Sequence, residues 1–323
     1  MEFNRTTIRT LSMLGQRGAF GTALTDIAKE NTRIIALSAD LCTTSGLDRF
    51  KNAFPERVIN VGIAEQNMIG VAAGMSTLGN IPFATTFANF AALRSCEQMR
   101  HFMGYMKENI KIVGFGGGFA MGMFGITHYG IEDIASIRTI SNLTIVSPAD
   151  CLETAKATIA AAQFNGPVYL RLTGVMNHPI VYKEDFEFTL GKAIKLQEGT
   201  DIAIFATGGM VHQSIRAAKQ LEEQGISCSV TNIHTIKPMD ADAIHDALGM
   251  KLIVTVEEHS TIGGLGSAIA EVLTDLRTKP PQLRIGVSNE YLPAGSYDYM
   301  LEQYGLTENH ITLKIQNKFK EIL

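Results

Sequence analysis

Two kinds of hydrophobic pattern alternate along the chain. Short runs of consecutive apolar, often β-branched residues predict buried strands, whereas longer segments with apolar residues every three or four positions predict helices. The strand-like runs in the first half are 33–40, 57–63, 81–87, 110–115, 143–148 and 166–174. The helix-like segments between them are 18–31, 64–79, 88–109, 131–140 and 149–164. Strand–helix alternation of this kind predicts a parallel, doubly wound α/β sheet.

A charged stretch with a proline, residues 175–197, interrupts this alternation. A second set of α/β segments then runs from residue 201 to residue 287. We therefore predict two doubly wound domains, residues 1–180 and a smaller one over 198–323, joined by a linker over 181–197. The length of 323 residues agrees with about two domains.

Composition and charge exclude several classes of protein. The chain is 46% hydrophobic and 19% charged, which is normal for a globular protein with a large core. A formal charge of −4 without a Lys/Arg cluster argues against nucleic-acid binding. Four separated cysteines predict reduced thiols in a cytoplasmic protein. The N-terminal stretch lacks the apolar region of a signal peptide, and no apolar run is long enough to predict a membrane span.

Familiar nucleotide, hydrolase and metal motifs are incomplete or absent. Gly114 lies near the end of a predicted strand and Gly116 directly follows it, but Phe119 occupies the position of the third glycine in GxGxxG. The chain contains no GxxxxGK[ST], no GxSxG and no HExxH. A nucleotide-binding, serine-hydrolase or zinc-enzyme interpretation therefore has little support, and no residue is predicted to bind a metal.

The stretch VINVGIAEQNMIGVAAGMSTLG, residues 58–79, places Glu65 among neighbours that we expect to be buried, Ile63 among them. One interpretation is a carboxylate in the first turn of a helix, where it complements the helix dipole. The other is catalytic: a buried carboxylate needs a partner, and the aminopyrimidine of thiamine diphosphate offers a basic nitrogen. Phe87 and Phe90 could form an apolar wall against that ring, or simply pack in the core.

Several motifs together resemble the C-terminal half of transketolase, and most closely the second subunit of split, two-chain transketolases. They include SADL, VINVGIAEQNM, FATTFANF, GITHYGIEDIASIR and VEEHSTIGGLGSAIAEVL, in that order, within a resemblance that runs from about residue 15 to residue 315. Each motif is only moderately specific, but their shared order is strong. The resemblance implies a pyrimidine-binding domain followed by the transketolase C-terminal domain.

The resemblance also implies roles for individual residues. Glu65 matches the catalytic glutamate that partners the pyrimidine nitrogen, and His128 matches the histidine near the cofactor and the substrate oxygens. The remaining cofactor-binding positions that it implies are Asp40, Ile63, Phe87 and Phe90. The substrate-binding positions are Arg17, Phe124, His128 and Arg171.

A transketolase site needs a GDG…N motif for the diphosphate and its metal, and this chain contains no GDG. The resemblance therefore implies that the diphosphate and Mg²⁺ are held mainly by a separate N-terminal transketolase subunit carrying that motif. It also implies homodimerisation within an α2β2 heterotetramer.

Four positions depart from the family pattern at the substrate end. Phe124 replaces an aspartate that reads a hydroxyl of the ketose, and Gly116 stands where a phosphate-binding histidine is expected. Gly174 stands where a second phosphate-binding arginine is expected, with Arg171 as a possible replacement, and Leu93 replaces a common tyrosine. Changes of this kind shift specificity rather than cofactor activation.

We therefore predict the pyrimidine-side subunit of a transketolase-like transferase. It would move a two-carbon ketol unit from a ketose to an aldose, with modified, possibly sulfonated, sugars as substrates. A subunit like the β subunit of a 2-oxo acid dehydrogenase or like deoxyxylulose phosphate synthase is the alternative with the same cofactor chemistry. A non-catalytic paralogue that acts as a scaffold is the alternative from another class.

Overall fold

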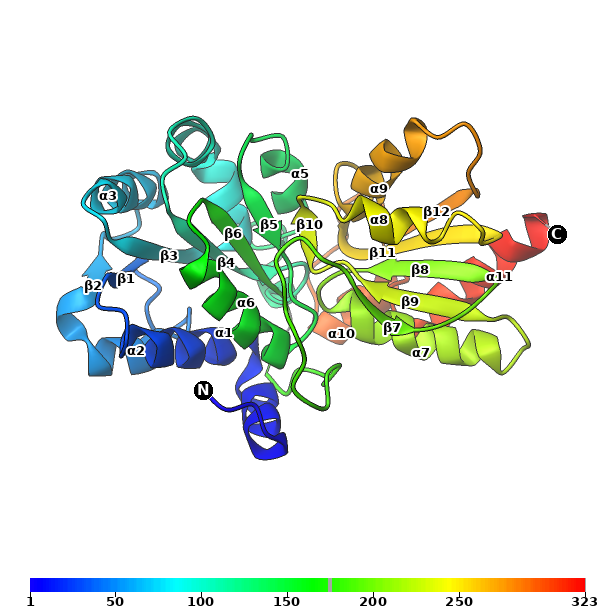
Figure 1. The fold of residues 1–323 in the computed structure, drawn as a ribbon, viewed down its shortest axis with the longest axis horizontal. Coiled ribbons are helices and arrows are strands. Elements are labelled where there is room, and N and C mark those ends of the chain that lie inside the picture. The colour runs from blue at the N-terminus through cyan, green and yellow to red at the C-terminus, as the bar shows by residue number, and fades with distance from the viewer. Residues whose placement is uncertain (174–175, 323) are drawn as a thin grey trace.

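A computed structural model describes residues 1–173 and 176–322, in which two α/β units lie end to end (Figure 1). The first unit contains a seven-stranded sheet with the order β10-β5-β6-β4-β3-β1-β2. Its strands are β1 (Ile34–Ser38), β2 (Val58–Asn60), β3 (Ile81–Phe87), β4 (Lys111–Gly117), β5 (Thr144–Val146), β6 (Val168–Thr173) and β10 (Thr235–Lys237). Every pairing in it is parallel except that of β10 with β5. The predicted doubly wound fold is confirmed.

The helical segments of the first unit lie on both sides of this sheet (Figure 1). The α-helices are α1 (Arg5–Ala28), α2 (Asp48–Ala53), α3 (Glu65–Thr77), α4 (Cys96–Gln98), α5 (Asp133–Ile137) and α6 (Cys151–Gln163). The other helical turns are η1 (Pro55–Arg57), η2 (Phe90–Arg94), η3 (Met99–Tyr105) and η4 (Gly122–Phe124).

The segment 88–109 is not the single amphipathic helix that its spacing predicts. It divides into the π-helical turns η2 and η3, separated by the short helix α4. A π turn accommodates one more residue than an α turn and re-aims the side chains that follow, which is why such turns are common at functional sites. Here η2 ends at Arg94, whose side chain contacts Glu65.

The second unit contains a five-stranded sheet with the order β12-β11-β8-β9-β7. Its strands are β7 (Ile194–Gln197), β8 (Ile202–Ala206), β9 (Cys228–Asn232), β11 (Leu252–Ser260) and β12 (Gln282–Val287). Its helices are α7 (Met210–Glu222), α8 (Ala241–His245), α9 (Leu265–Thr274), α10 (Tyr297–Gln303) and α11 (Glu308–Ile322). The sequence patterns had not indicated α10 or α11.

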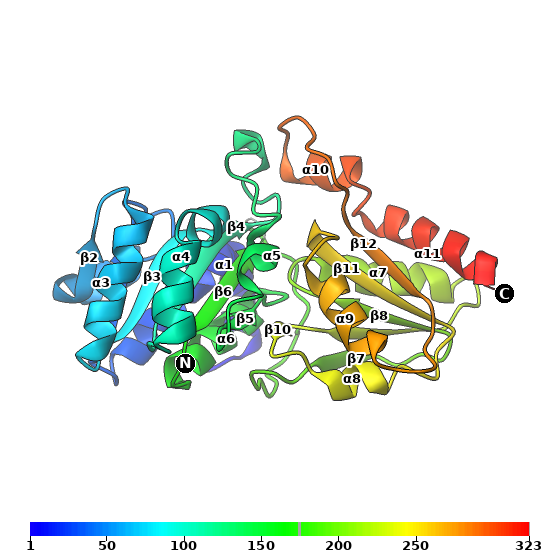
Figure 2. The ribbon, with the colours of Figure 1, turned by 90° about the horizontal axis from the view of Figure 1, so that it is seen from above.

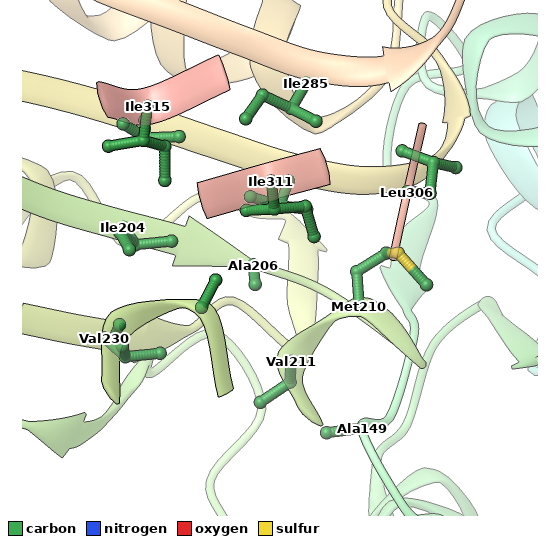
Figure 3. Packing of buried hydrophobic residues seen from close by; sticks show 14 of the residues in the cluster. Ala149, Ile204, Ala206, Met210, Val211, Val230, Ile285, Leu306, Ile311 and Ile315 are labelled. Atoms are coloured by element: carbon green, nitrogen blue, oxygen red, sulfur yellow. The ribbon is translucent and has the colours of Figure 1, made fainter. Parts of the chain in front are cut away.

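Figure 3 shows the apolar side chains that close the core of the second unit. Ile204 and Val230 of the sheet face Val211 of α7, while Ile311 and Ile315 of α11 cover them. This cluster continues into the first unit, because Phe119, Tyr129, Ala149 and Leu152 belong to it. The two units therefore share one core across their boundary.

Two strands also cross the predicted domain limits. Residues 194–197, expected to be linker, form β7, the edge strand that pairs with β9. Strand β10 belongs by sequence to the second domain but pairs with β5 of the first sheet. The linker prediction is therefore corrected at its C-terminal end. In the part of the chain that the structure describes, no helix combines the length and apolar character needed to cross a bilayer.

Candidate functional site

Glu65 is the first residue of α3 and is only 5% exposed. The chain turns into this helix at Gly62, whose positive φ of 74° favours glycine. The Glu65 carboxylate lies in the first helical turn, as the simpler sequence interpretation predicts, and accepts a hydrogen bond of 2.9 Å from Arg94 Nη1. The buried carboxylate thus has a charged partner within its own chain.

Arg94 joins three parts of the site. Besides its bond to Glu65, its guanidinium carbon lies 3.5 Å from the centroid of the Phe90 ring, a cation–π contact. Its backbone carbonyl accepts a hydrogen bond of 3.0 Å from Gln66 Nε2. Arg94 is not among the site residues that the sequence predicts. The available signal was a single cation in the otherwise apolar run after Phe90.

Four aromatic rings gather beside this ion pair. The His128 ring centroid lies 5.0 Å from that of Phe87, 5.2 Å from that of Phe90 and 5.1 Å from that of Phe124. Phe87 and Phe90 also contact each other, with centroids 5.2 Å apart. The structure therefore brings together four residues that the sequence analysis placed in one site.

His128 lies in the loop between β4 and α5. Its Nδ1 lies 2.9 Å from Thr127 Oγ1, and Asn89 Nδ2 donates a hydrogen bond of 2.7 Å to the Thr127 carbonyl. Burial, and then the positive charge of Arg94, lowers the pKa of His128 below its ordinary value. The imidazole is therefore neutral near pH 7 and able to accept a proton.

A cavity of about 480 Å³ opens beside Glu65 and Arg94, and Ile63, Gln66 and Asn67 contribute to its lining. Ile63 is 77% exposed, so the expectation that it is buried is wrong. It precedes the helix, beyond the end of β2, where no other element covers it. Its exposed position at the cavity leaves it free to contact a bound molecule.

The hydrogen bonds of Asp40 and Arg17 do not involve Glu65, Arg94 or His128. The exposed Asp40 follows β1 in a left-handed conformation, and it exchanges two hydrogen bonds of 3.0 Å with the side chain of Asn60. Arg17, in α1, is half-buried and donates a 2.8 Å hydrogen bond from Nη1 to the Thr44 carbonyl. Burial lowers its pKa. Asn60, the last residue of β2 and paired there with Ser38 of β1, was not predicted.

Arg171 does not support the substrate role predicted for it. Its side chain is 1% exposed, and its Nε donates to Asp133 at 2.8 Å. Its Nη2 donates to the carbonyls of Gly130 at 2.6 Å and Glu258 at 3.0 Å. Because these groups occupy the guanidinium inside the protein, Arg171 is a structural residue here, and the prediction is corrected.

The other positions that depart from the family pattern lie in different surroundings. Gly116 has a φ of 72°, and a Cβ there would lie 3.3 Å from Phe87 Cδ1, so a histidine at this position would be strained. Phe124 and Leu93 are exposed by 65% and 54%. Gly174 lies outside the described residues. Phe124 and Leu93 thus present apolar side chains at the surface where the family pattern carries polar groups.

The chemistry of these groups fits the pyrimidine end of thiamine diphosphate. A carboxylate withheld from water can bind a ring nitrogen, and neighbouring aromatic side chains can contact the ring faces. Within residues 1–173 and 176–322, no three His, Cys, Asp or Glu side chains form a group that could hold a metal ion. The buried carboxylate and the aromatic rings suit an organic ring.

Comparison with known protein families covers nearly the whole chain. Residues 12–174 match the model of the transketolase pyrimidine binding domain, and residues 191–311 match that of the transketolase C-terminal domain. The two models leave residues 175–190 between them, and residues 181–190 of this gap overlap the predicted linker.

Curated relatives and a solved structure resemble the chain over most of their lengths. It is 41% identical to the 6-deoxy-6-sulfo-D-fructose transketolase subunit SqwH of Clostridium sp. (strain MSTE9), over 91% of each chain. It is 36% identical to a subunit of the apulose-4-phosphate transketolase of Phocaeicola vulgatus, over 93% of this chain and 96% of that one. The solved structure of a split gene transketolase, an inactive beta4 tetramer, has a TM-score of 0.84 and 40% identity, and covers 95% of this chain and 99% of its own.

These relatives are subunits, and the match to them runs from end to end. The two family models account for both α/β units, and the fold and the order of the motifs agree with them. The chain belongs to the thiamine-diphosphate-dependent transketolase family and is the C-terminal, pyrimidine-side subunit of a split transketolase-like transferase.

Proposed function

We propose that this subunit supplies the pyrimidine half of a transketolase site that transfers a two-carbon ketol unit between modified sugars. The observation that carries the proposal is the buried Glu65 carboxylate beside Phe90 and His128. Thiamine diphosphate, when bound, supplies an electron sink for breaking and forming carbon–carbon bonds. The residues of this chain bind its ring, exclude water and handle protons.

Glu65 has the chemistry to hold the aminopyrimidine. Its carboxylate already accepts a charged hydrogen bond from Arg94 and would accept one from a ring nitrogen in the same way. The Arg94 side chain is 47% exposed, so it can withdraw towards solvent without leaving a buried charge of its own. Phe87 and Phe90 would form the apolar wall of the ring site.

His128 is the proposed proton-transfer residue. Its pKa is lowered by burial, which keeps the imidazole neutral and able to accept a proton from a substrate hydroxyl. Three aromatic side chains, Phe87, Phe90 and Phe124, pack against its ring at centroid distances of 5.0 to 5.2 Å. The protonated imidazole would then stabilise a neighbouring alkoxide.

The second half of the site is proposed to come from an N-terminal transketolase subunit with a GDG…N motif. That subunit would hold the diphosphate and Mg²⁺ through oxygen ligands. Support comes from the absence of GDG in this sequence and from the end-to-end match to split subunits. An α2β2 heterotetramer is the assembly that we propose.

The proposed substrates are modified ketoses. The names of two relatives specify 6-deoxy-6-sulfo-fructose and apulose 4-phosphate, and neither is a standard pentose or hexose phosphate. In this chain Phe124 cannot accept a hydrogen bond where the family pattern has an aspartate, and Arg171 is engaged inside the protein. Such a surface suits a ketose donor that does not need the standard protein contacts to its hydroxyl or phosphate groups.

The test is to co-express the chain with an N-terminal transketolase subunit and replace Glu65 by Gln. We expect Glu65→Gln to abolish turnover while the subunit stays folded and assembled, because the neutral amide cannot act as the carboxylate does. Glu97→Gln, at a glutamate with a 68% exposed side chain, is the control and should keep full activity. Near-normal turnover of Glu65→Gln would contradict the catalytic assignment.

A binding measurement separates the enzyme from a scaffold. Isothermal titration of thiamine diphosphate into the assembled complex should show saturable binding, which a scaffold does not need. A donor panel of standard ketose phosphates, a sulfonated ketose and pyruvate then identifies the reaction. Decarboxylation of pyruvate would favour chemistry like that of deoxyxylulose phosphate synthase or a 2-oxo acid dehydrogenase.

A further inference from the structure

The loop that carries His128 is closed at its base. Gly118 and Gly130 exchange two backbone hydrogen bonds, of 2.7 and 2.9 Å, and residues 119–129 project between them. Phe124 and His128 both lie in this projecting segment, which we call the His128 loop. The orientation of the base therefore decides where both side chains point.

A carboxylate of the second unit binds this base. Glu258, near the end of β11, is 1% exposed, and its Oε1 accepts a hydrogen bond of 2.5 Å from the Phe119 amide. Its Oε2 accepts one of 2.9 Å from the Tyr297 hydroxyl. A Cβ on Gly118 would lie only 2.1 Å from Glu258 Oε1, so the glycine is what lets the carboxylate approach the loop.

Arg171 ties the other end of the base to the same residue. Its Nη2 donates both to the Gly130 carbonyl and to the backbone carbonyl of Glu258. Its Nε pairs with Asp133, at the start of α5, directly after the loop. The two ends of the His128 loop thus converge on Glu258, one through the side chain and one through Arg171.

Packing adds further contacts between the loop and the second unit. The Phe119 ring stacks on Tyr304, with centroids 4.7 Å apart and an interplanar angle of 15°. The Tyr129 hydroxyl donates to the Leu292 carbonyl at 3.4 Å, and the Gly295 amide donates to the Gly122 carbonyl at 3.3 Å. Figure 2 shows η4 of the loop rising beside α10. The loop is held by the second unit as well as by the first.

We infer that Glu258 is a positioning residue for His128, and that the second unit acts on the reaction by fixing the base of the His128 loop. The inference rests on the proposed function in giving His128 its part in the reaction. The hydrogen bonds of the Glu258 carboxylate go to the Phe119 amide and the Tyr297 hydroxyl, and not to Glu65 or His128. Its carboxylate acts through the Phe119 amide, which is why loss of the side chain should change His128 while Glu65 stays in place.

Glu257 provides a matched control at the neighbouring position. It is equally buried, but its carboxylate accepts hydrogen bonds from Leu265 and Gly266, at the start of α9, within the second unit. Loss of either carboxylate removes two hydrogen bonds to a buried acid. Only the loss of Glu258 releases the His128 loop.

Hydrogen exchange of the isolated chain tests the inference without cofactor or partner. Losing this buried hydrogen bond should make amides in 119–130 exchange about 10- to 100-fold faster in Glu258→Ala. In Glu257→Ala these amides should exchange as in the wild type, with changes confined to α9 and the adjoining β11. Burial raises the pKa of Glu258 to about 7. Because a neutral group is therefore tolerated there, Glu258→Gln should restore slow exchange.

Kinetics of the assembled enzyme give the second readout. Glu258→Ala should lower kcat about 10-fold or more with KM changed less than about threefold. The reason is that a misplaced proton-transfer group slows the chemical step but leaves substrate binding nearly unchanged. Glu257→Ala should keep kcat within about twofold of the wild type. If Glu258→Ala does not fold, Tyr297→Phe, which removes only the hydroxyl donor, should show the same changes to a smaller degree.

The outcomes are distinct. Equal exchange rates in 119–130 for the Glu257 and Glu258 variants would overturn the inference, as would a Glu258 variant with fast exchange and unchanged kcat. If exchange responds as expected but Glu65→Gln remains active, the proposed function fails while the hold of Glu258 on the loop stands.

Discussion

Arg94 Nη1 lies 2.9 Å from Glu65 Oε1, so the carboxylate that the sequence assigns to a cofactor nitrogen already has a cation from its own chain. The two residues are 29 positions apart and meet where the π turn η2 ends against the first turn of α3. The same guanidinium covers the face of Phe90. Arg94 thus contacts two of the groups that we propose for the pyrimidine ring.

The first prediction concerns this ion pair. In the isolated chain, Arg94→Ala should lower the free energy of unfolding by about 1–2 kcal/mol, because the buried Glu65 carboxylate loses its charged partner. The destabilisation stays this small because solvent around the partly exposed Arg94 screens the ion pair. A double-mutant cycle with Glu65→Ala, measured by urea unfolding, should give a coupling of roughly 1 kcal/mol. The exposed pair Arg100–Glu97, 3.9 Å apart, is the control and should give almost none. Equal coupling in both pairs would contradict the prediction.

The second prediction distinguishes a structural Arg171 from a substrate ligand. Arg171→Met leaves Asp133 buried without its cation and should lower the free energy of unfolding by about 3–5 kcal/mol. Arg17→Met removes one hydrogen bond to a backbone carbonyl and should cost much less. Thermal unfolding of both variants checks this. A normal unfolding temperature together with a raised KM for Arg171→Met would return the residue to the substrate site.

The third prediction concerns substrate selection at Phe124. Because the side chain is exposed, Phe124→Asp should change the free energy of unfolding by less than about 0.5 kcal/mol. It should raise kcat/KM for a standard ketose phosphate relative to the natural donor by about tenfold, by supplying a hydrogen-bond acceptor. Met123→Asp adds the same charge at a neighbouring position that is 71% exposed and serves as the control. An equal shift in both variants would show a general charge effect instead.

The fourth prediction uses the pH dependence of Glu153, a fully buried acid of α6 that binds Asn232 of the second unit. Burial, and to a lesser degree neighbouring Asp150, raises the pKa of Glu153 from 4.5 to about 8. The folded protein therefore binds this proton more tightly than the unfolded chain. The stabilisation of the folded protein by this proton is complete below pH 4.5 and is lost as the pH rises to about 8.

Glu153→Gln does not titrate, so it isolates this contribution. The free energy of unfolding of the wild type minus that of the variant should fall steadily between about pH 5 and pH 8. Denaturant unfolding at several pH values measures it. Glu187→Gln, at an exposed position, should give a flat difference. A flat difference for Glu153→Gln as well would show that burial does not raise this pKa.

Much of the fold followed from periodicity. Strand β3 has the predicted bounds, and α3 and α6 begin and end within two residues of the expected positions, because their apolar residues are buried where the pattern places them. The failures lie where burial is decided by distant segments. The segment 88–109 has helical spacing, yet it divides into π turns that carry Arg94 to Glu65. Ile63 is apolar, yet no element covers it.

The site shows the same division. The sequence by itself determined the order of the motifs and the absence of a GDG motif, and through its resemblance to transketolases it predicted that Glu65, Phe87, Phe90 and His128 share one site, because residue identity and motif order carry that information. Only the tertiary structure decided that Arg94 partners Glu65, that Arg171 turns inward to Asp133, and that Glu258 binds the base of the His128 loop. Each of these contacts joins segments from 29 to 139 residues apart. A local pattern specifies that a charge is buried, whereas the folded chain specifies which group neutralises it.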